Sequence, residues 1–331
     1  MLHLKLQPHP RRKPDLQTEE SEVEFDESSE NIFESFLAHI FPDDAATWHG
    51  DPGQHFLYSS ARYGDLEITI PSYPDQTNKN TEIATAQTTE QDDIDRVDDG
   101  VKLHAHFLWS GALVIAEAVE NADSLETKGI AMTDNNTDIW NVKGETVMEL
   151  GAAAALPSLV CALANASRVV ATDHPLSPAL TGTIAYNMDC NLRNRLPSPS
   201  TDISIHPHEW GVLNDTFAQQ NKGRFTRIIA SDCFFMSLQH PNILRTMRWF
   251  LAPEGKIWIA SGFHTGRACV AKFFERAVEN GFEIERIFER DLIERDQNGK
   301  EIRREWQPVR IDEGPENRRR WCVVAVLKWK D

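Results

Sequence analysis

The stretch from Val147 to Leu159 reads VMELGAAAALPSL, and it decides the fold. It opens with an apolar run typical of a buried strand, and Gly151 follows at once. Pro157 suits the first turn of a helix, because the N–H that proline lacks needs no partner there. A strand, a tight turn and a helix in this order are typical of a ligand site at the carboxyl end of a parallel strand. The alternative is a tightly packed strand–helix junction with no ligand.

Strands and helices alternate on both sides of this stretch. We expect strands over 146–150, 168–172, 202–206, 225–231, 255–261, 282–290 and 320–329, and helices over 104–120, from Pro157, over 176–190, 239–250 and 266–280. This alternation predicts an α/β fold with a seven-stranded, mostly parallel sheet and helices on both faces. The segment 291–319 is charged and has no convincing crossover helix, so we expect the last strand to be antiparallel.

Charge is distributed unevenly along the chain. Residues 1–100 hold 7 Lys and Arg against 22 Asp and Glu, a net charge of −15, whereas residues 101–331 hold 27 against 29, a net charge of −2. Without a basic stripe, we expect no direct binding of nucleic acid.

The same contrast divides the chain into regions. We expect a disordered acidic arm over 1–30, an extension over 31–100 and the main domain over 101–331. Within the extension we expect a helix over 31–41, a hairpin turned at residues 63–65 and a disordered insertion over 74–100.

Cysteine and histidine placement narrows the chemistry. The five cysteines are scattered without a CxxC pair, which favours reduced thiols and a cytoplasmic protein. Arg11 to Lys13 could add nuclear import. No metal site is expected, because His104 and His106 have no ligand partners at metal-binding spacing. The longest apolar run contains Pro157 and is too short to span a membrane.

Two ligand classes compete for the turn after Leu150. A dinucleotide requires G-x-G-x-x-G, but the second and third glycine positions hold Ala153 and Leu156. S-adenosylmethionine has no phosphate, and its amino-acid end tolerates small side chains in a more open turn. Asp173, 22 positions after Gly151 at the end of the next strand, can accept hydrogen bonds from ribose hydroxyls in either class. The turn therefore favours S-adenosylmethionine.

Motifs beyond this turn resemble family 16 of the class I, seven-β-strand methyltransferases, and within it a fungal branch labelled nicotinamide N-methyltransferase-like. The motifs occur in the family's order: LHAHFLWSGALVIAE (103–117), VMELGAAAALPSLVCAL (147–163), VVATDHP (169–175), HEWGVL (208–213), RIIASDCFFMSLQHPNIL (227–244) and IASGFHTGRACVAKFFERAVENGFEIERIFERD (259–291). The resemblance implies a Rossmann-like methyltransferase domain that uses S-adenosylmethionine.

The resemblance also implies roles for single residues. The cofactor would lie among Trp109, Glu149, Gly151, Ala153, Asp173, Trp210 and Ser231. Of these, Glu149, Gly151 and Ala153 would surround the methionine end, Asp173 would take the ribose, and Trp210 would cover the adenine face. Many family members have G-x-G-x-G where this chain has alanines, so we expect the methyl groups of Ala153 and Ala155 to lean toward the donor.

The stretch DCFF, from Asp232 to Phe235, matches the family's [DE]-x-x-[YF] signature. We expect Asp232 and Phe235 to act in catalysis, Asp232 by orienting the amine, with Phe234 and Phe235 forming the channel wall. A carboxylate favours the charged ammonium, so deprotonation is left to water and burial. His264 is a candidate substrate contact. The alternative for DCFF is an Asp that caps the following helix.

Four functions stay open at this point. The first is an N-methyltransferase acting on a protein lysine or N-terminal amine, with a substrate that the acidic regions could recruit if it is basic. The second is methylation of a small amine such as nicotinamide. The third is a non-catalytic methyltransferase fold that regulates a partner subunit. The fourth, a dehydrogenase, is disfavoured by the missing phosphate-binding glycines.

Overall fold

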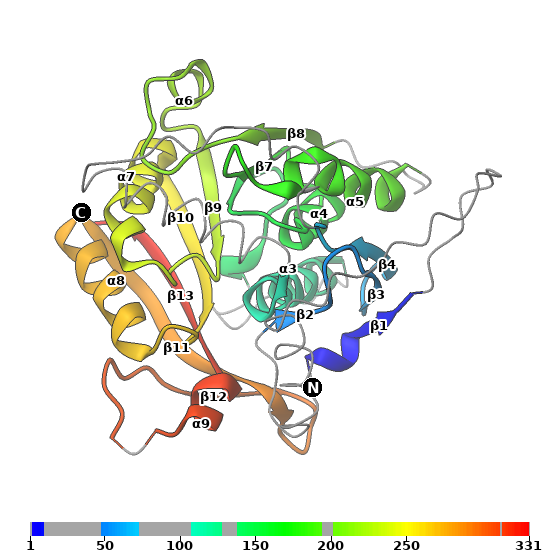
Figure 1. Ribbon diagram of the computed structural model, residues 1–331, viewed down its shortest axis with the longest axis vertical. Helices are drawn as coiled ribbons and strands as arrows, with labels where there is room; N and C mark the ends of the chain where they lie inside the picture. The colour runs from blue at the N-terminus through cyan, green and yellow to red at the C-terminus, as the bar shows by residue number, and fades with distance from the viewer. Residues whose placement is uncertain are drawn as a thin grey trace, which may run out of the picture.

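The computed structural model describes residues 2–9, 48–72, 107–127, 138–193, 201–311 and 313–330 (Figure 1). The expected helix over 31–41 and insertion over 74–100 lie outside these residues.

An eight-stranded sheet forms the centre of the molecule, in the order β12-β11-β13-β10-β9-β6-β7-β8. The strands are β6 (Thr146–Leu150), β7 (Arg168–Asp173), β8 (Asp202–Pro207), β9 (Phe225–Ser231), β10 (Leu251–Gly262), β11 (Phe282–Arg295), β12 (Glu301–Glu305) and β13 (Trp321–Trp329). Strands β8, β7, β6, β9 and β10 are parallel, and β13 runs antiparallel between β10 and β11. The Rossmann-like α/β fold and its antiparallel last strand are confirmed.

The expected seven strands are one fewer than the structure has. The additional strand is β12, which pairs antiparallel with β11 at the sheet edge. Its sequence, EIRRE, has little apolar content and gives no strand pattern of its own. It is held by main-chain pairing and by arginines such as Arg304, which pairs with the buried Glu289.

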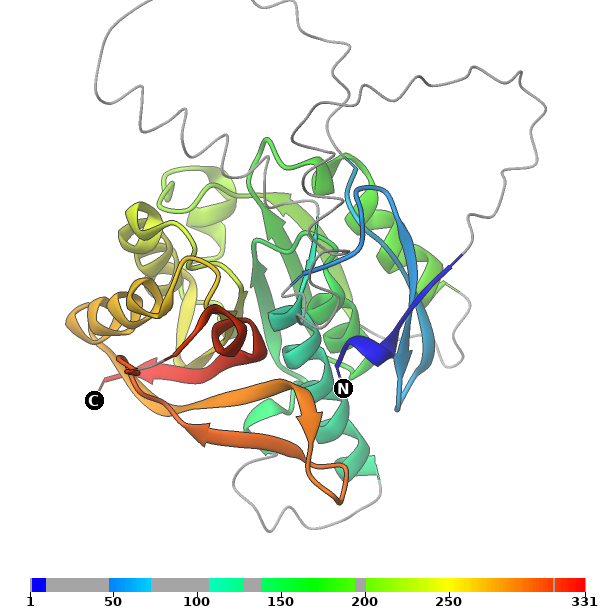
Figure 2. The same cartoon turned by 60° about the horizontal axis from the view of Figure 1, so that its bottom comes forward.

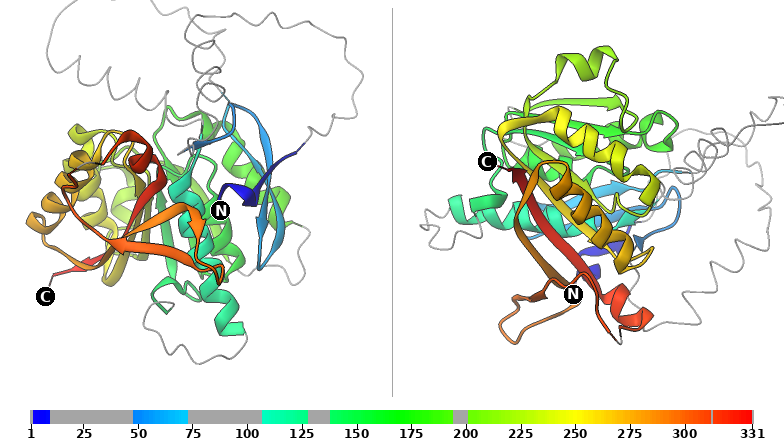
Figure 3. Two further views of the ribbon diagram at one scale, coloured as in Figure 1. Left: turned by 90° about the horizontal axis from the view of Figure 1, so that it is seen from below. Right: turned by 90° about the vertical axis from the view of Figure 1, so that its left-hand side faces the viewer.

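Helices cover both faces of the sheet, as expected (Figures 1 and 3). One face carries α3 (Ser110–Thr127), α4 (Leu156–Leu163) and α5 (Thr183–Leu192); the other carries α6 (Thr216–Gln220), α7 (His240–Phe250) and α8 (Arg267–Glu279). Successive residues of one strand serve the two faces, since Val147 packs in the first core and Met148 in the second. Shorter helices are η3 (Asp138–Trp140), η4 (Pro178–Thr181), η5 (Ser237–Gln239) and α9 (Pro315–Arg320).

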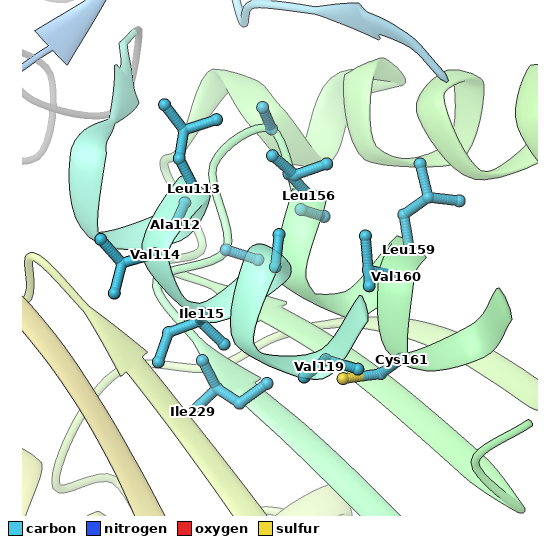
Figure 4. Packing of buried hydrophobic residues seen from close by; sticks show 14 of the residues in the cluster. Ala112, Leu113, Val114, Ile115, Val119, Leu156, Leu159, Val160, Cys161 and Ile229 are labelled. Carbon is cyan, nitrogen blue, oxygen red and sulfur yellow. The ribbon is translucent and has the colours of Figure 1, made fainter. Parts of the chain in front are cut away.

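Helix α3 packs closely on the sheet and on α4 (Figure 4). Its fully buried Ile115 lies toward Ile229 of β9, and Val119 lies toward Cys161 of α4. This packing fixes where the first turn of α3 lies relative to the carboxyl ends of the strands.

Two expected helices have different bounds. The helix expected over 104–120 begins only at Ser110, because Leu108–Trp109 form strand β5, paired with β2 (Trp48–His49). An apolar run such as FLW suits either structure, and the partner strand decides. The helix expected over 176–190 is divided at Gly182 into η4 and α5.

The N-terminal hairpin is confirmed as β3 (His55–Ser60) and β4 (Gly64–Thr69), and it lies beside α5 (Figure 2). The expectation of a disordered arm is wrong for residues 2–9. These residues form η1 (His3–Lys5) and β1 (Leu6–Pro8), and β1 pairs with β3. Leu2 is buried, and Lys5 forms ion pairs with Glu117 and Glu120, so apolar packing and these ion pairs hold the segment in place.

Among the described residues, none of the helices has the length and apolar character needed to cross a bilayer.

Candidate active site

A cavity with about 700 Å³ of empty space, which includes space open to solvent, lies at the carboxyl ends of the parallel strands. It is lined by Trp109, Gly151, Ala153, Asp173, His174, His208, Glu209, Trp210, Ser231, Asp232, Cys233, Phe235, Met236 and Gln239. The structure therefore brings together eight of the residues expected from sequence. Of the others, it places Glu149, Phe234 and His264 outside the cavity wall.

The turn after β6 has an unusual backbone. Gly151, Ala153 and Ala155 have φ angles of 63°, 46° and 55°, in the left-handed region that suits glycine. An alanine in this region costs about 1–2 kcal/mol. Ala153 lines the cavity, but the expectation that Ala155 also leans toward a ligand is wrong. Ala155 is the N-cap of α4, and its side chain is fully buried in the core.

Asp173 fixes this turn from the neighbouring strand. Its Oδ2 accepts a hydrogen bond from the main-chain N–H of Ala153 at 2.8 Å, and its Oδ1 accepts one from His174 at 2.7 Å. Burial raises the pKa of Asp173, and these hydrogen bonds oppose the rise. The side chain lies in the cavity wall, where an acceptor for a ligand hydroxyl was expected.

Glu149 lies behind the turn rather than in the cavity. It is fully buried, and its Oε2 accepts hydrogen bonds from the main-chain N–H and the hydroxyl of Ser158 in α4. Its Oε1 has no hydrogen-bond partner among the described residues. Burial raises the pKa of Glu149 to about 8, against the opposing effect of the Ser158 bonds. The Glu149 side chain therefore holds α4 to the end of β6 through Ser158. It does not make the direct ligand contact that was expected.

Asp232 joins three parts of the chain. Its Oδ1 accepts hydrogen bonds from Gly262 N and His264 Nε2, and its Oδ2 accepts one from Gly111 N, each at 2.7 Å. Gly111 is required by this close approach, because a Cβ there would lie 2.4 Å from Asp232 Oδ2 and 2.5 Å from Ala260 O. The carboxylate thus contacts the first turn of α3. The capping alternative required it to contact the helix that follows DCFF in the sequence, and these three hydrogen bonds do not include that helix.

The two phenylalanines of DCFF diverge. Phe235 lines the cavity beside Met236. Phe234 is fully buried and stacks on Phe273 of α8, with ring centroids 3.8 Å apart. Only Phe235 is therefore placed to form a channel wall.

His264 lies behind the cavity wall. Its ring packs against Trp109, with centroids 4.5 Å apart, while its Nε2 contacts Asp232. Thus Trp109, which lines the cavity, and Asp232 are both held by the same imidazole.

His208 is the residue that sequence reasoning missed most clearly. It directly follows β8, lines the cavity and is 2% exposed. Neither ring nitrogen has a hydrogen-bond partner among the described residues. Burial lowers its pKa to about 4, with Asp215 opposing weakly, so the ring is neutral near pH 7. The sequence signal that could have identified His208 as a site residue was its position directly after β8, two residues before Trp210.

The described residues contain no group of three or more His, Cys, Asp or Glu side chains placed to hold a metal ion.

The chain matches a known protein family. Residues 88–280 fit the family model described as lysine methyltransferase.

Individual relatives agree with that match. The chain is 34% identical over 203 residues to the protein N-terminal and lysine N-methyltransferase EFM7 of Gibberella zeae, covering 57% of this chain and 69% of the relative. The relative of the same name from Candida glabrata is 30% identical over 208 residues, with 61% and 73% covered. Among solved structures, magnesium protoporphyrin IX methyltransferase from Synechocystis PCC 6803 is 13% identical, with a TM-score of 0.38 and 75% and 90% covered.

Proposed function

Because the chain belongs to the lysine methyltransferase family, we propose that it transfers a methyl group from S-adenosylmethionine to an amine of a protein, either a lysine or an N-terminus. The observation that carries this proposal is the cavity at the strand ends. Its wall combines Asp173, Trp210 and the turn from Gly151 to Ala153.

The residues of the cavity fit this cofactor. Its wall combines aromatic rings, those of Trp109, Trp210 and Phe235, with a few polar side chains, as is usual for sites that bind small molecules. The turn has small side chains and positive φ angles at Gly151 and Ala153, which allow close approach of a ligand without a phosphate cradle. Among the described residues, neither ring nitrogen of the neutral His208 has a hydrogen-bond partner, and we infer that a polar group of the ligand bonds to it.

We assign the cofactor's parts to these residues. Asp173 would accept hydrogen bonds from the ribose, and the ring of Trp210 would cover the adenine face. The backbone of Gly151 and Ala153 would hold the amino-acid end, and Ser231 at the end of β9 would contribute to the same wall. S-adenosylmethionine, when bound, supplies an electrophilic methyl group on its sulfonium sulfur.

The chain's contribution to the reaction is alignment and exclusion of water. A carboxylate has about four lone-pair sites, and Asp232 already accepts three hydrogen bonds. Only Oδ2 can accept one more, so a target amine would be oriented by that atom. Because a carboxylate favours the charged ammonium, deprotonation is left to water and burial. Trp109, Phe235 and Met236 form the apolar part of the wall that excludes water.

The acidic composition of two stretches of the chain favours a basic protein substrate. Residues 10–47 hold 3 basic and 11 acidic residues, and residues 73–106 hold 3 and 8, so together they carry −8 − 5 = −13 of the net −17. These two stretches join the described structure at Trp48 and Phe107, next to β2 and β5, and Trp109 of β5 lines the cavity. A chain with this excess of negative charge would attract substrates rich in lysine or arginine.

Narrower assignments belong to the same proposal. We keep the fungal nicotinamide N-methyltransferase-like branch as the subgroup, but place protein amines before small amines, because the relatives carry protein-directed names. A regulatory role beside a partner subunit is less favoured, since only one of the two turn alanines lines the cavity. We place the protein in the cytoplasm, with the nucleus as a second compartment.

The test is transfer of radiolabelled methyl groups into a cell extract, followed by hydrolysis and separation of methylated amino acids. We expect labelled protein carrying methyl-lysine or a methylated N-terminal amine. Asp173→Ala, checked for folding by circular dichroism, should give no label. Label in small amines alone would point to the nicotinamide-like activity, and no label with intact cofactor binding would point to a regulatory role.

A further inference from the structure

His264 lies between two residues of the candidate site without facing the cavity itself. Its Nε2 is 2.7 Å from Asp232 Oδ1, and its ring centroid is 4.5 Å from that of Trp109. The side chain is 14% exposed. Gly262 allows this placement, because a Cβ at that position would lie 2.5 Å from the imidazole Cε1.

The surroundings of the imidazole define its protonation pattern. Nε2 faces a carboxylate oxygen and therefore donates a hydrogen bond to it. Nδ1 is buried and has no hydrogen-bond partner among the described residues, so a proton there would lack an acceptor. The geometry thus places a proton on Nε2, which donates it to Asp232 Oδ1.

This hydrogen bond determines which oxygen of Asp232 is available. Gly262 N and His264 Nε2 together fill both lone-pair sites of Oδ1. Gly111 N fills one site of Oδ2 and leaves the other. Removal of the imidazole would free a second acceptor position on Oδ1 and would loosen the carboxylate.

Trp109 is held from two directions. Its backbone pairs with Trp48 in the β2–β5 ribbon, and the next residue, Ser110, contacts His49 through its hydroxyl at 3.1 Å. Its ring is supported by His264. Because Trp109 forms part of the cavity wall, that support acts on the space where the cofactor would bind.

We propose that His264 is a positioning residue with two separable roles: its Nε2–H holds Asp232 so that only Oδ2 faces the amine, and its ring holds Trp109 against the cofactor site. The inference rests on the proposed function. It assigns no contact between His264 and the substrate.

Two variants separate the roles. His264→Gln keeps a donor at a similar reach but loses the ring, whereas His264→Phe keeps the ring and loses the donor. For His264→Phe we expect kcat to fall by about 10- to 100-fold, with the dissociation constant for S-adenosylmethionine changed less than about threefold. For His264→Gln we expect the reverse: kcat near that of the wild type and weaker cofactor binding. Calorimetry measures cofactor binding, and the steady-state rate of radiolabelled methyl transfer into cell-extract protein, at saturating S-adenosylmethionine, measures the change in kcat relative to the wild type.

The matched control is His55→Gln, on the separate β1–β3–β4 sheet, where His55 contacts Thr69. Equal loss of kcat, cofactor affinity and melting temperature in both His264 variants would show a merely structural residue and overturn the inference. Wild-type values in both would also overturn it. If the wild-type protein itself binds S-adenosylmethionine but transfers no methyl group, the proposed function fails instead, and the cofactor-binding arm alone still tests the support of Trp109.

Discussion

At the scale of single residues, the turn after β6 shows what composition can and cannot predict. The sequence shows alanine and leucine where a phosphate-binding turn has glycines, and this difference correctly distinguished the turn from a phosphate-binding one. The left-handed φ angles of Ala153 and Ala155 are not visible, because an alanine gives no sign that it occupies a conformation suited to glycine. The strain of this turn therefore emerges only from the structure.

Relief of that strain is measurable. Ala153→Gly should raise the free energy of unfolding by about 0.5–1 kcal/mol, because the gain from removing a Cβ at positive φ exceeds the added entropy of the unfolded chain. Urea unfolding measures the change. The control is Ala154→Gly, which is buried and has no positive φ, and which should lower stability by about 1 kcal/mol. A loss of stability in Ala153→Gly equal to that of the control would contradict the account.

Glu149 predicts a pH dependence of stability. Its pKa of about 8 in the folded protein lies above the ordinary value of 4.5, so the folded state binds a proton that the unfolded state releases. The contribution to stability is full below pH 4.5 and is lost as pH rises toward and through about 8. Glu149→Gln should abolish this loss, and the difference between variant and wild type should grow by about 2–5 kcal/mol from pH 5 to pH 9.

That comparison uses urea unfolding across the pH range, because other groups titrate in both proteins and cancel in the difference. Glu254→Gln removes an exposed carboxylate and controls for the change in net charge. If the curves of Glu149→Gln and the wild type run parallel from pH 5 to pH 9, Glu149 does not hold a proton in the folded state.

At the scale of elements, the meeting of α3 with the strand ends organises the site. Gly111 N and Asp232 Oδ2 join the first turn of the helix to the end of β9, and the adjacent Trp109 lines the cavity. The sequence predicted α3 but placed its start too early, since the apolar run before Ser110 does not reveal that Trp48 pairs with Trp109. The local spacing of apolar residues cannot predict pairing between strands that are far apart in the sequence.

A substitution at the junction tests its importance. In Gly111→Ala the new Cβ would lie 2.5 Å from the main-chain Ala260 O, which cannot rotate away. We expect a loss of stability of about 1–3 kcal/mol and cofactor binding weakened at least about tenfold, because Trp109 must move with the turn. Gly299→Ala, with no atom within 4 Å of its Cβ, should cost about 1 kcal/mol and leave cofactor binding unchanged. Unchanged binding in Gly111→Ala would refute the role of this junction.

Strand ends explain the success and failure of the site predictions. Asp173 and Trp210 could be placed because Asp173 ends β7 and Trp210 lies shortly after the end of β8, and the carboxyl ends of parallel strands meet at one edge of the sheet. Phe234 and Glu149 could not, because the sequence does not show to which side of a strand end each side chain turns. His208 was missed for the same reason, and its burial without partners appears only in three dimensions.

At the scale of the whole molecule, the N-terminal residues hold distant parts of the fold together. Lys5 contacts Glu117 and Glu120 of α3 at 3.2 and 3.5 Å, and Leu2 N donates to Leu292 O of β11. Burial raises the pKa of Glu117, but the positive charges of Arg290, Lys5 and Arg295 outweigh this effect and lower the pKa to about 2. The net charge suggested an arm without structure, because the acidic residues dominate the average over residues 1–30 and hide the different composition of residues 2–9.

Removal of the lysine charge should therefore be costly. Lys5→Met keeps the apolar stem and should lower stability by about 1–2 kcal/mol at pH 7, since two buried carboxylates lose a cation while Arg290 and Arg295 stay near Glu117. This loss should shrink as pH falls, first where Glu120 gains a proton, since burial raises its pKa above the ordinary value, and then toward about 2, where Glu117 gains one. Lys328→Met breaks an exposed pair with Glu283 and should change stability by less than about 1 kcal/mol. Equal, pH-independent effects would contradict the prediction.

The central claim is that the cavity binds a methyl donor and not a dinucleotide, and calorimetric titration of the full chain tests it most directly. We predict saturable binding of S-adenosylmethionine that Asp173→Ala abolishes while the variant stays folded, and no binding of NAD. Binding of NAD, or S-adenosylmethionine binding that survives Asp173→Ala unchanged, would contradict the account.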